Sequence, residues 1–125
     1  MKKRILVVED QEDNRRIIRD LLMSAGYELV EAADGEAGVR LAEAERPDLI
    51  LMDIQLPVLD GHEATRRIKS NPELRAIPII VVTSYALSGD DVKAMKAGSD
   101  AYVAKPFSPR QLLATIREFL PETDA

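Results

Sequence analysis

The sequence predicts a doubly wound α/β fold, in which helices cover both faces of a five-stranded parallel sheet. Three observations lead to this prediction. Short apolar runs rich in Val and Ile alternate along the chain with segments of helical periodicity. Acidic residues end two of these runs, and a Lys-Pro pair follows a third. Alternating strands and helices are typical of parallel sheets. After each strand the chain must cross back to the end of the sheet where that strand began, and a helix usually makes this crossover.

Five runs have the length and composition of buried strands. In chain order they are Ile5 to Val8, Glu28 to Ala32, Leu49 to Met52, Ile79 to Thr83 and Ala101 to Val103. The first, third and fourth are continuous apolar runs, which indicates central strands buried on both faces. The second contains two glutamates and suits an edge, so we expect the strand order 2-1-3-4-5.

Helical patterns fill the intervals between these strands. Two strong apolar stripes consist of Ile17, Ile18, Leu21, Leu22 and Ala25, and of Leu112, Leu113, Ile116, Phe119 and Leu120. Weaker helical segments fit Glu36 to Glu45, His62 to Ser70 and Asp90 to Ala97. Glycine, proline and the Asn71-Pro72 pair supply the stop signals between them. The single histidine, His62, is expected at the solvent-exposed start of its helix.

Length and composition exclude several classes of protein. The 125 residues fit one domain, 1–125, with a short tail at 121–125, and we expect no output domain. The formal net charge of -5 argues against direct DNA binding. Cysteine is absent, which excludes disulfides and thiolate chemistry and suits a cytoplasmic protein. The apolar run after the basic N-terminus is too short for a signal peptide or a membrane span.

The charged residues that end the predicted strands form the candidate site. In a sheet of order 2-1-3-4-5, ligands bind beyond the carboxyl ends of strands 1 and 3, where Glu9, Asp10 and Asp53 fall. Two carboxylates about 4 Å apart repel by roughly 4 kcal/mol at an effective dielectric of 20, so three require a counter-charge. Oxygen ligands without His or Cys point to Mg²⁺. With Lys105 and a metal present, Asp53 is expected to act as a nucleophile toward phosphorus.

Taken together and in this order, several segments resemble the receiver domain of two-component response regulators over essentially the whole chain. They are Ile5-Leu6-Val7-Val8-Glu9-Asp10, Asp48-Leu49-Ile50-Leu51-Met52-Asp53-Ile54-Gln55-Leu56-Pro57, Asp60-Gly61, Ile79-Ile80-Val81-Val82-Thr83, Ala97-Gly98 and Ala101-Tyr102-Val103-Ala104-Lys105-Pro106-Phe107. The resemblance implies a flavodoxin-like (βα)5 fold. Within the family, the chain looks similar to single-domain chemotaxis and cell-cycle regulators and to hybrid-kinase receivers.

The resemblance assigns a role to each acidic residue. Asp53 would be the phosphoacceptor, taking the phosphoryl group from a phosphohistidine of a partner protein. Asp10 would bind Mg²⁺ directly, Glu9 through water, and Gln55 through its backbone carbonyl. Glu9 departs from the more usual aspartate, which lengthens the reach and keeps the charge.

Other residues would contact the phosphoryl group or report its presence. Thr83 and Lys105 would contact the phosphoryl oxygens, and the Lys105-Pro106 peptide would be cis, which an X-Pro bond adopts at modest cost. Thr83 and Tyr102 resemble the family's coupled switch pair. Gln55 and Tyr85 occupy variable positions that affect the lifetime of the phosphoryl group.

The implied function is that of a phosphoacceptor, not an enzyme acting on other molecules. The expected partners are a histidine kinase or a histidine phosphotransfer protein, and a downstream target protein, with the chain a monomer or weak dimer. An alternative is a phosphorelay intermediate or phosphate sink that passes the group to a histidine phosphotransfer protein. A Mg²⁺-dependent phosphohydrolase would need a second aspartate where Gln55 stands.

Overall fold

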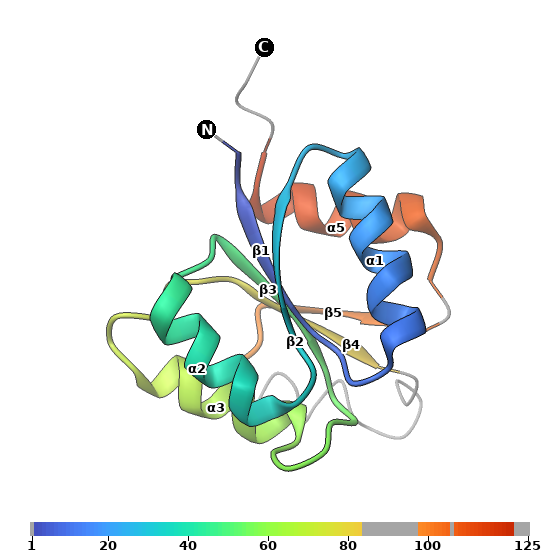
Figure 1. Cartoon of the computed structure of the whole chain (residues 1–125). Helices are drawn as coiled ribbons and strands as arrows, with labels where there is room; N and C mark the ends of the chain where they lie inside the picture. The colour runs from blue at the N-terminus through green and yellow to red at the C-terminus, as the bar shows by residue number, and fades with distance from the viewer. Residues whose placement is uncertain (1, 84–97, 106, 122–125) are drawn as a thin grey trace.

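The computed structural model describes residues 2–83, 98–105 and 107–121 (Figure 1). Within these ranges the chain forms a parallel sheet and four helices. The strands are β1 (Arg4–Val8), β2 (Glu28–Ala32), β3 (Leu49–Asp53), β4 (Ile79–Thr83) and β5 (Ala101–Ala104). The helices are α1 (Glu12–Ser24), α2 (Gly35–Glu45), α3 (Gly61–Ser70) and α5 (Pro109–Phe119).

The sheet has the predicted order, β2-β1-β3-β4-β5, and all four strand pairs are parallel. Strand β2 lies at one edge, as its two glutamates predict. From β1 the chain first adds β2 on one side and then adds β3 on the other side, so the topological switch point lies between β1 and β3. The register pairs Val8 with Met52, so the residues that follow them, Glu9 and Asp53, lie side by side at the carboxyl ends of β1 and β3.

The helices lie on opposite faces of the sheet (Figure 1). An apolar cluster lies between the sheet and the helices on each face. Alternate residues of each central strand point to opposite faces, because side chains along a strand have a period of two. On one face, Leu6 and Ile50 pack with Ala64 and Ile68 of α3. On the other face, Ile18 and Leu22 of α1 pack with Ile116 of α5 and with inward residues of β1 and β3.

Local capping residues explain where three of the helices begin. The side chains of Asp34, Asp60 and Ser108 each accept a hydrogen bond from the backbone N–H three residues ahead, at 2.8, 2.9 and 3.0 Å respectively. Helix α1 follows Gln11, whose side chain makes no capping bond, but its first turn contains Glu12 and Asp13. Acidic side chains stabilise the positive end of a helix dipole.

The predicted boundaries differ from the structure by one residue at several ends. Strand β1 begins at Arg4, β3 includes Asp53, and β5 continues to Ala104. The reason is that Arg4 pairs with Glu28 and Asp53 pairs with Val82, so strand pairing extends beyond the apolar runs into charged residues. The predicted helix Asp90 to Ala97 and the tail from residue 122 lie outside the described residues.

The prediction of a solvent-exposed His62 is wrong. The residue is half buried, and its ring nitrogens are shielded from solvent. The first turn of α3, which contains His62, closely approaches the end of β3. A Cβ on Gly61 would lie 2.1 Å from the carbonyl oxygen of Asp53, so only glycine permits this approach.

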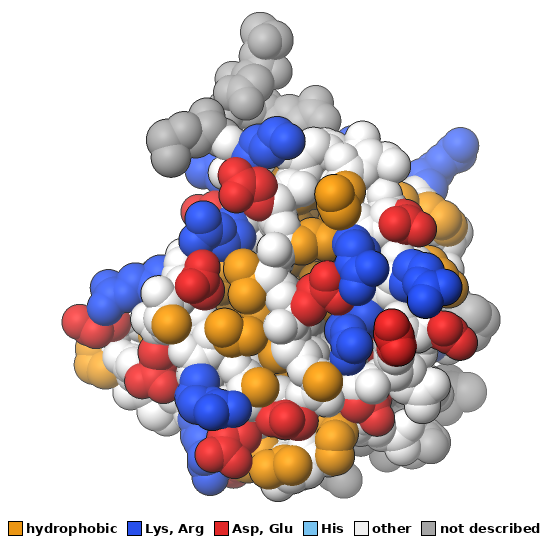
Figure 2. All heavy atoms as spheres, in the orientation of Figure 1, with side chains coloured by type: hydrophobic (Ala, Val, Ile, Leu, Met, Phe, Trp, Pro, Cys, Tyr) orange, Lys and Arg blue, Asp and Glu red, His pale blue; other side chains and the backbone are white. Residues whose placement is uncertain are grey.

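The surface carries mixed charge. Acidic and basic side chains alternate across the face seen in Figure 2, with apolar side chains between them. The described part of this face therefore has no extended patch of basic side chains such as a nucleic-acid-binding surface carries. None of the helices in the described ranges is long and apolar enough to cross a membrane.

Candidate functional site

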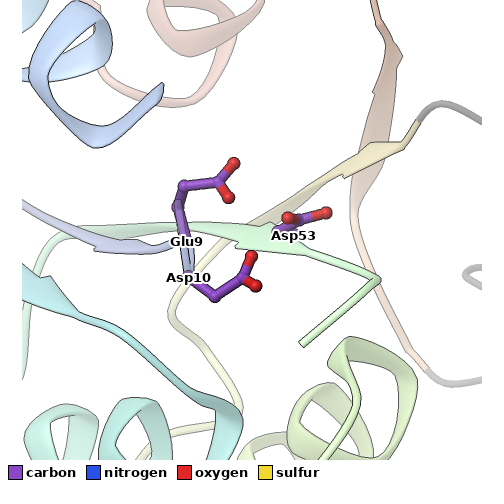
Figure 3. Close-up of side chains that lie close together, drawn as sticks. All are labelled: Glu9, Asp10 and Asp53. Carbon is purple, nitrogen blue, oxygen red and sulfur yellow. The ribbon is translucent and has the colours of Figure 1, made fainter. Parts of the chain in front are cut away.

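Three carboxylates converge beyond the carboxyl ends of β1 and β3 (Figure 3). Glu9 and Asp10 follow β1, and Asp53 is the last residue of β3. One oxygen from each lies within 4.8 Å of the others. The sequence predicted this convergence from the strand order, since the carboxyl ends of neighbouring parallel strands share one edge.

Glu9 is the most constrained of the three acids. It is only 2% exposed. Its Oε2 accepts a hydrogen bond from the Gln11 backbone N–H at 3.1 Å, and its Oε1 accepts one from the Lys105 ammonium at 3.1 Å. Both carboxylate oxygens therefore already have protein donors.

Asp53 is 7% exposed and lies at the floor of the site. Its Oδ1 accepts a long hydrogen bond of 3.3 Å from the Gln55 backbone N–H. Its Oδ2 is 3.6 Å from the Lys105 Nζ. A single ammonium is thus shared by two buried carboxylates and lies closer to Glu9. With Asp10 also ionised, three carboxylate charges and one ammonium meet here among the residues that the structure describes.

This imbalance shows in the pKa values of the acids. Burial, followed by the neighbouring Glu9 charge, raises the pKa of Asp53 from 3.8 to about 6, although Lys105 acts in the opposite direction. Burial and the Glu9 carboxylate also raise the pKa of Asp10. Burial acts to raise the pKa of Glu9 as well, but the Gln11 N–H and the Lys105 ammonium outweigh it and lower that pKa.

The three acids open into a pocket of about 310 Å³. Its other lining residues are Gln11, Asn14, Gln55 and Lys105. The pocket is large enough for a hydrated cation and a phosphoryl group, and the described residues that line it all have polar or charged side chains. A hard divalent cation fits this set of donors, because it binds oxygen and supplies the charge that the carboxylates lack. Gln55 lines the same pocket, so a contribution from its backbone is compatible with its position.

Several predicted residues are described only in part or not at all. The backbone of Thr83 ends β4 opposite Ala104, but its side chain lies outside the described part of the structure. The predicted cis peptide involves Pro106, which is also outside it, as is Tyr85. Tyr102 lies on β5, pairs with Val81, and is 40% exposed.

The structure adds one residue that the sequence analysis missed. The guanidinium of Arg15 on α1 donates a hydrogen bond of 2.9 Å to the backbone carbonyl of Glu9. A basic residue in the second turn of a helix is ordinarily interpreted as a solvent-exposed side chain. Nothing in its spacing signals that it reaches back to the end of the preceding strand.

The model of the response regulator receiver domain family matches residues 5–117, a range that contains the three acids and Lys105. The chain belongs to this family. The resemblance seen in the sequence motifs is therefore confirmed, and with it the assignment to two-component signalling.

Individual relatives of this receiver domain match almost end to end. The polar-differentiation response regulator DivK of Brucella anthropi is 43% identical over 120 residues, which cover 96% of this chain and 98% of that protein. DivK of Brucella ovis is 42% identical with the same coverage.

Solved structures confirm the predicted flavodoxin-like fold. The receiver domain of a sensor histidine kinase from Pseudomonas aeruginosa superposes with a TM-score of 0.91 at 42% identity, covering 96% of this chain and 98% of that one. That structure has a magnesium ion coordinated in its active-site cleft. The chemotaxis response regulator CheY4 of Vibrio cholerae superposes with a TM-score of 0.89 at 28% identity, covering 95% and 99% of the two chains.

Proposed function

We propose that this receiver domain accepts a phosphoryl group on Asp53 from a phosphohistidine of a partner protein. The observation that carries the proposal is the placement of Asp53. It is a buried carboxylate at the floor of an acidic pocket, with one ammonium beside it. At neutral pH a carboxyl with a pKa of about 6 is mostly ionised, so it is available as a nucleophile.

In the proposed transfer, an Asp53 carboxylate oxygen forms a bond to phosphorus as the phosphorus–nitrogen bond of phosphohistidine breaks. The electron pair of that bond stays on the imidazole nitrogen, and the proton that the other ring nitrogen carries in the phosphohistidine makes the leaving group a neutral imidazole. Asp53 becomes an acyl phosphate. The donor histidine returns to its neutral form, so atoms and charge balance.

Residues of the pocket would hold Mg²⁺ and the transferred group. Asp10 and Asp53 would bind the cation directly, Glu9 through water, and Gln55 through its backbone carbonyl. When bound, Mg²⁺ would neutralise the negative charge of the phosphoryl oxygens. Lys105 Nζ is 3.6 Å from Asp53, so its ammonium is close enough to contact a phosphoryl group on that residue. The hydroxyl of Thr83 would supply a further contact.

The proposed output is a change of surface around β5, α5 and the helix that the sequence predicts over Asp90 to Ala97. The Tyr102 side chain is 40% exposed, which fits an outward position in the unphosphorylated domain. Movement of the Thr83 hydroxyl to the phosphoryl group would let the ring turn inward. A downstream target protein would then bind the altered face. The domain would catalyse only its own phosphorylation and dephosphorylation, in the cytoplasm beside its kinase.

Two kinds of pathway are compatible with this chemistry. Similarity to DivK over 98% of that regulator's length favours a response regulator that acts on a target. Similarity to the receiver of a sensor histidine kinase favours the alternative of a phosphorelay intermediate that passes the group to a histidine phosphotransfer protein.

The test is incorporation of phosphate from phosphoramidate, which carries the same phosphorus–nitrogen bond as the proposed donor. We expect incorporation with Mg²⁺, none with EDTA, and release of the label by hydroxylamine, which cleaves acyl phosphates. Acid-stable, hydroxylamine-resistant label would contradict the proposal. Transfer from the labelled domain to a panel of histidine phosphotransfer proteins would separate the two pathways.

A further inference from the structure

A salt-bridge network joins α1, β2 and the end of β1 next to the acidic pocket. It begins at Arg15, which donates from Nη1 to the Glu9 carbonyl oxygen at 2.9 Å. The Arg15 Nε lies 3.4 Å from Glu31 Oε1 on β2. The Arg15 side chain is only 18% exposed, so it is held between these two acceptors and is not a free surface charge.

Glu31 is itself fixed by a second arginine on the same helix. The Nε and Nη2 of Arg19 donate to the two carboxylate oxygens of Glu31 at 2.7 and 2.8 Å. This is the bidentate geometry that makes arginine–carboxylate pairs strong and directional. The Arg19 hydrogen bonds lower the pKa of Glu31, so Glu31 remains an ionised anchor for Arg15.

The carbonyl that Arg15 binds has a special position. The Glu9 carbonyl and the Asp10 backbone nitrogen belong to one planar peptide unit, so a donor that fixes the carbonyl also fixes the plane from which Asp10 departs. The other polar groups of Glu9 are also bonded. Its N–H donates to the Ala32 carbonyl at 3.0 Å, and its carboxylate accepts from Gln11 and Lys105.

We propose that Arg15 is a positioning residue of the cation site, which sets the orientation of the Glu9–Asp10 peptide and so of the Asp10 carboxylate. This inference rests on the proposed function, because it concerns the same Mg²⁺ site. Arg15 would not touch the cation or the phosphoryl group. It would act only through the peptide between the two acids.

The sign of the effect separates this role from simple electrostatics. Arg15 carries a positive charge close to a cation site, so its charge alone weakens Mg²⁺ binding. If charge were all that mattered, removing it would tighten Mg²⁺ binding. If Arg15 positions the acids, removing it weakens Mg²⁺ binding despite the lost repulsion. Outer-shell partners of metal ligands typically change metal affinity by about 10-fold to 100-fold.

The experiment compares Arg15→Met, Arg15→Lys and Arg19→Met by calorimetric titration with Mg²⁺ alone. Arg19 is the matched control, since it lies one helical turn further on, binds the same glutamate and has no hydrogen bond to Glu9 among the described residues. We expect the Mg²⁺ dissociation constant of Arg15→Met to rise about 10-fold, at the lower end of the outer-shell range. Arg19→Met should stay within about 2-fold, because the Arg15 contacts with the Glu9 carbonyl and with Glu31 do not involve Arg19.

If Arg15→Met fails to fold, the charge-preserving variant Arg15→Lys still distinguishes positioning from charge alone. Lysine keeps the charge but lacks the planar fork that spans the Glu9 carbonyl and Glu31. Positioning therefore predicts weaker Mg²⁺ binding in Arg15→Lys, whereas charge alone predicts wild-type binding. Unchanged or tighter binding in the folded Arg15 variants, or an equal loss in Arg19→Met, would overturn the inference.

The two proposals fail in different ways in this experiment. A wild-type domain that neither binds Mg²⁺ nor takes phosphate from phosphoramidate would contradict the proposed function. A wild-type domain that does both, with Arg15 variants that bind Mg²⁺ as tightly, would contradict only the role of Arg15.

Discussion

Replacement of Asp53 by asparagine should make the metal-free domain more stable at neutral pH. The substitution keeps the size of the side chain and an acceptor for the Gln55 N–H, and it removes one charge from a buried acidic cluster. A pKa raised from 3.8 to about 6 means that the native state binds the Asp53 proton more tightly than the unfolded state does. The stability that protonation contributes is present below 3.8 and is lost as the pH rises through about 6.

The magnitude follows from the pKa itself. The difference between 3.8 and about 6 corresponds to about 3 kcal/mol between the protonated and ionised forms. That difference already includes the attraction of the Lys105 ammonium, which lies 3.6 Å away and lowers the pKa of Asp53, so no further offset applies for this ion pair and about 3 kcal/mol is the upper end of the expected gain. We therefore expect the free energy of unfolding at pH 7.5 to rise by about 1 to 3 kcal/mol.

The assay is urea unfolding in EDTA at several pH values between 4 and 8, followed by circular dichroism. The advantage of Asp53→Asn over wild type should shrink as the pH falls through about 6, where wild-type Asp53 takes up its proton. Asp20→Asn, on the exposed side of α1, serves as the control and should stay within about 0.5 kcal/mol of wild type. A less stable Asp53→Asn protein, or an advantage independent of pH, would refute the electrostatic account of the site.

Three further predictions concern the cation, the switch and the fold. Asp10→Asn should weaken Mg²⁺ binding, because it removes a charged ligand, and raise the stability of the metal-free domain, because the pKa of Asp10 is also raised. An unchanged calorimetric Mg²⁺ titration would count against a cation shared by the three acids. Thr83→Ala should still take phosphate on Asp53, yet show a much smaller change in amide chemical shifts over residues 90–119, because Tyr102 would no longer be coupled to the site. A full wild-type response would contradict that coupling. Gly61→Ala should destabilise the domain by more than about 2 kcal/mol in urea unfolding, because the new Cβ would lie 2.1 Å from the Asp53 carbonyl; near-wild-type stability would show that α3 shifts freely.

Much of the fold could be predicted from the chain because the signals are local. Continuous apolar runs mark the central strands, and helical stripes mark α1 and α5, whose inward residues Ile18 and Ile116 are buried. The acidic cluster was also predictable, because parallel strands bring their carboxyl ends to one edge whatever the details of packing. Strand ends were less certain, since pairing with a neighbour carries Arg4 and Asp53 into the ladders.

Contacts that depend on the orientation in which a helix packs against the sheet could not be predicted from the sequence. The Arg15 hydrogen bond to the Glu9 carbonyl requires the rotation and tilt of α1, which local periodicity does not determine. The half-burial of His62 likewise does not follow from its position near the start of a helix. Nor does the sequence pattern show that the Lys105 ammonium lies nearer to Glu9, at 3.1 Å, than to Asp53, at 3.6 Å.

The central claim is that Asp53 alone receives the phosphoryl group. After reaction with phosphoramidate and Mg²⁺, borohydride reduction converts an aspartyl phosphate to homoserine, which mass spectrometry locates in the digested chain. The account predicts homoserine at position 53 in the wild-type domain and none anywhere in Asp53→Asn. Homoserine at another acidic position in the wild type, or undiminished phosphate uptake by the variant, would contradict it.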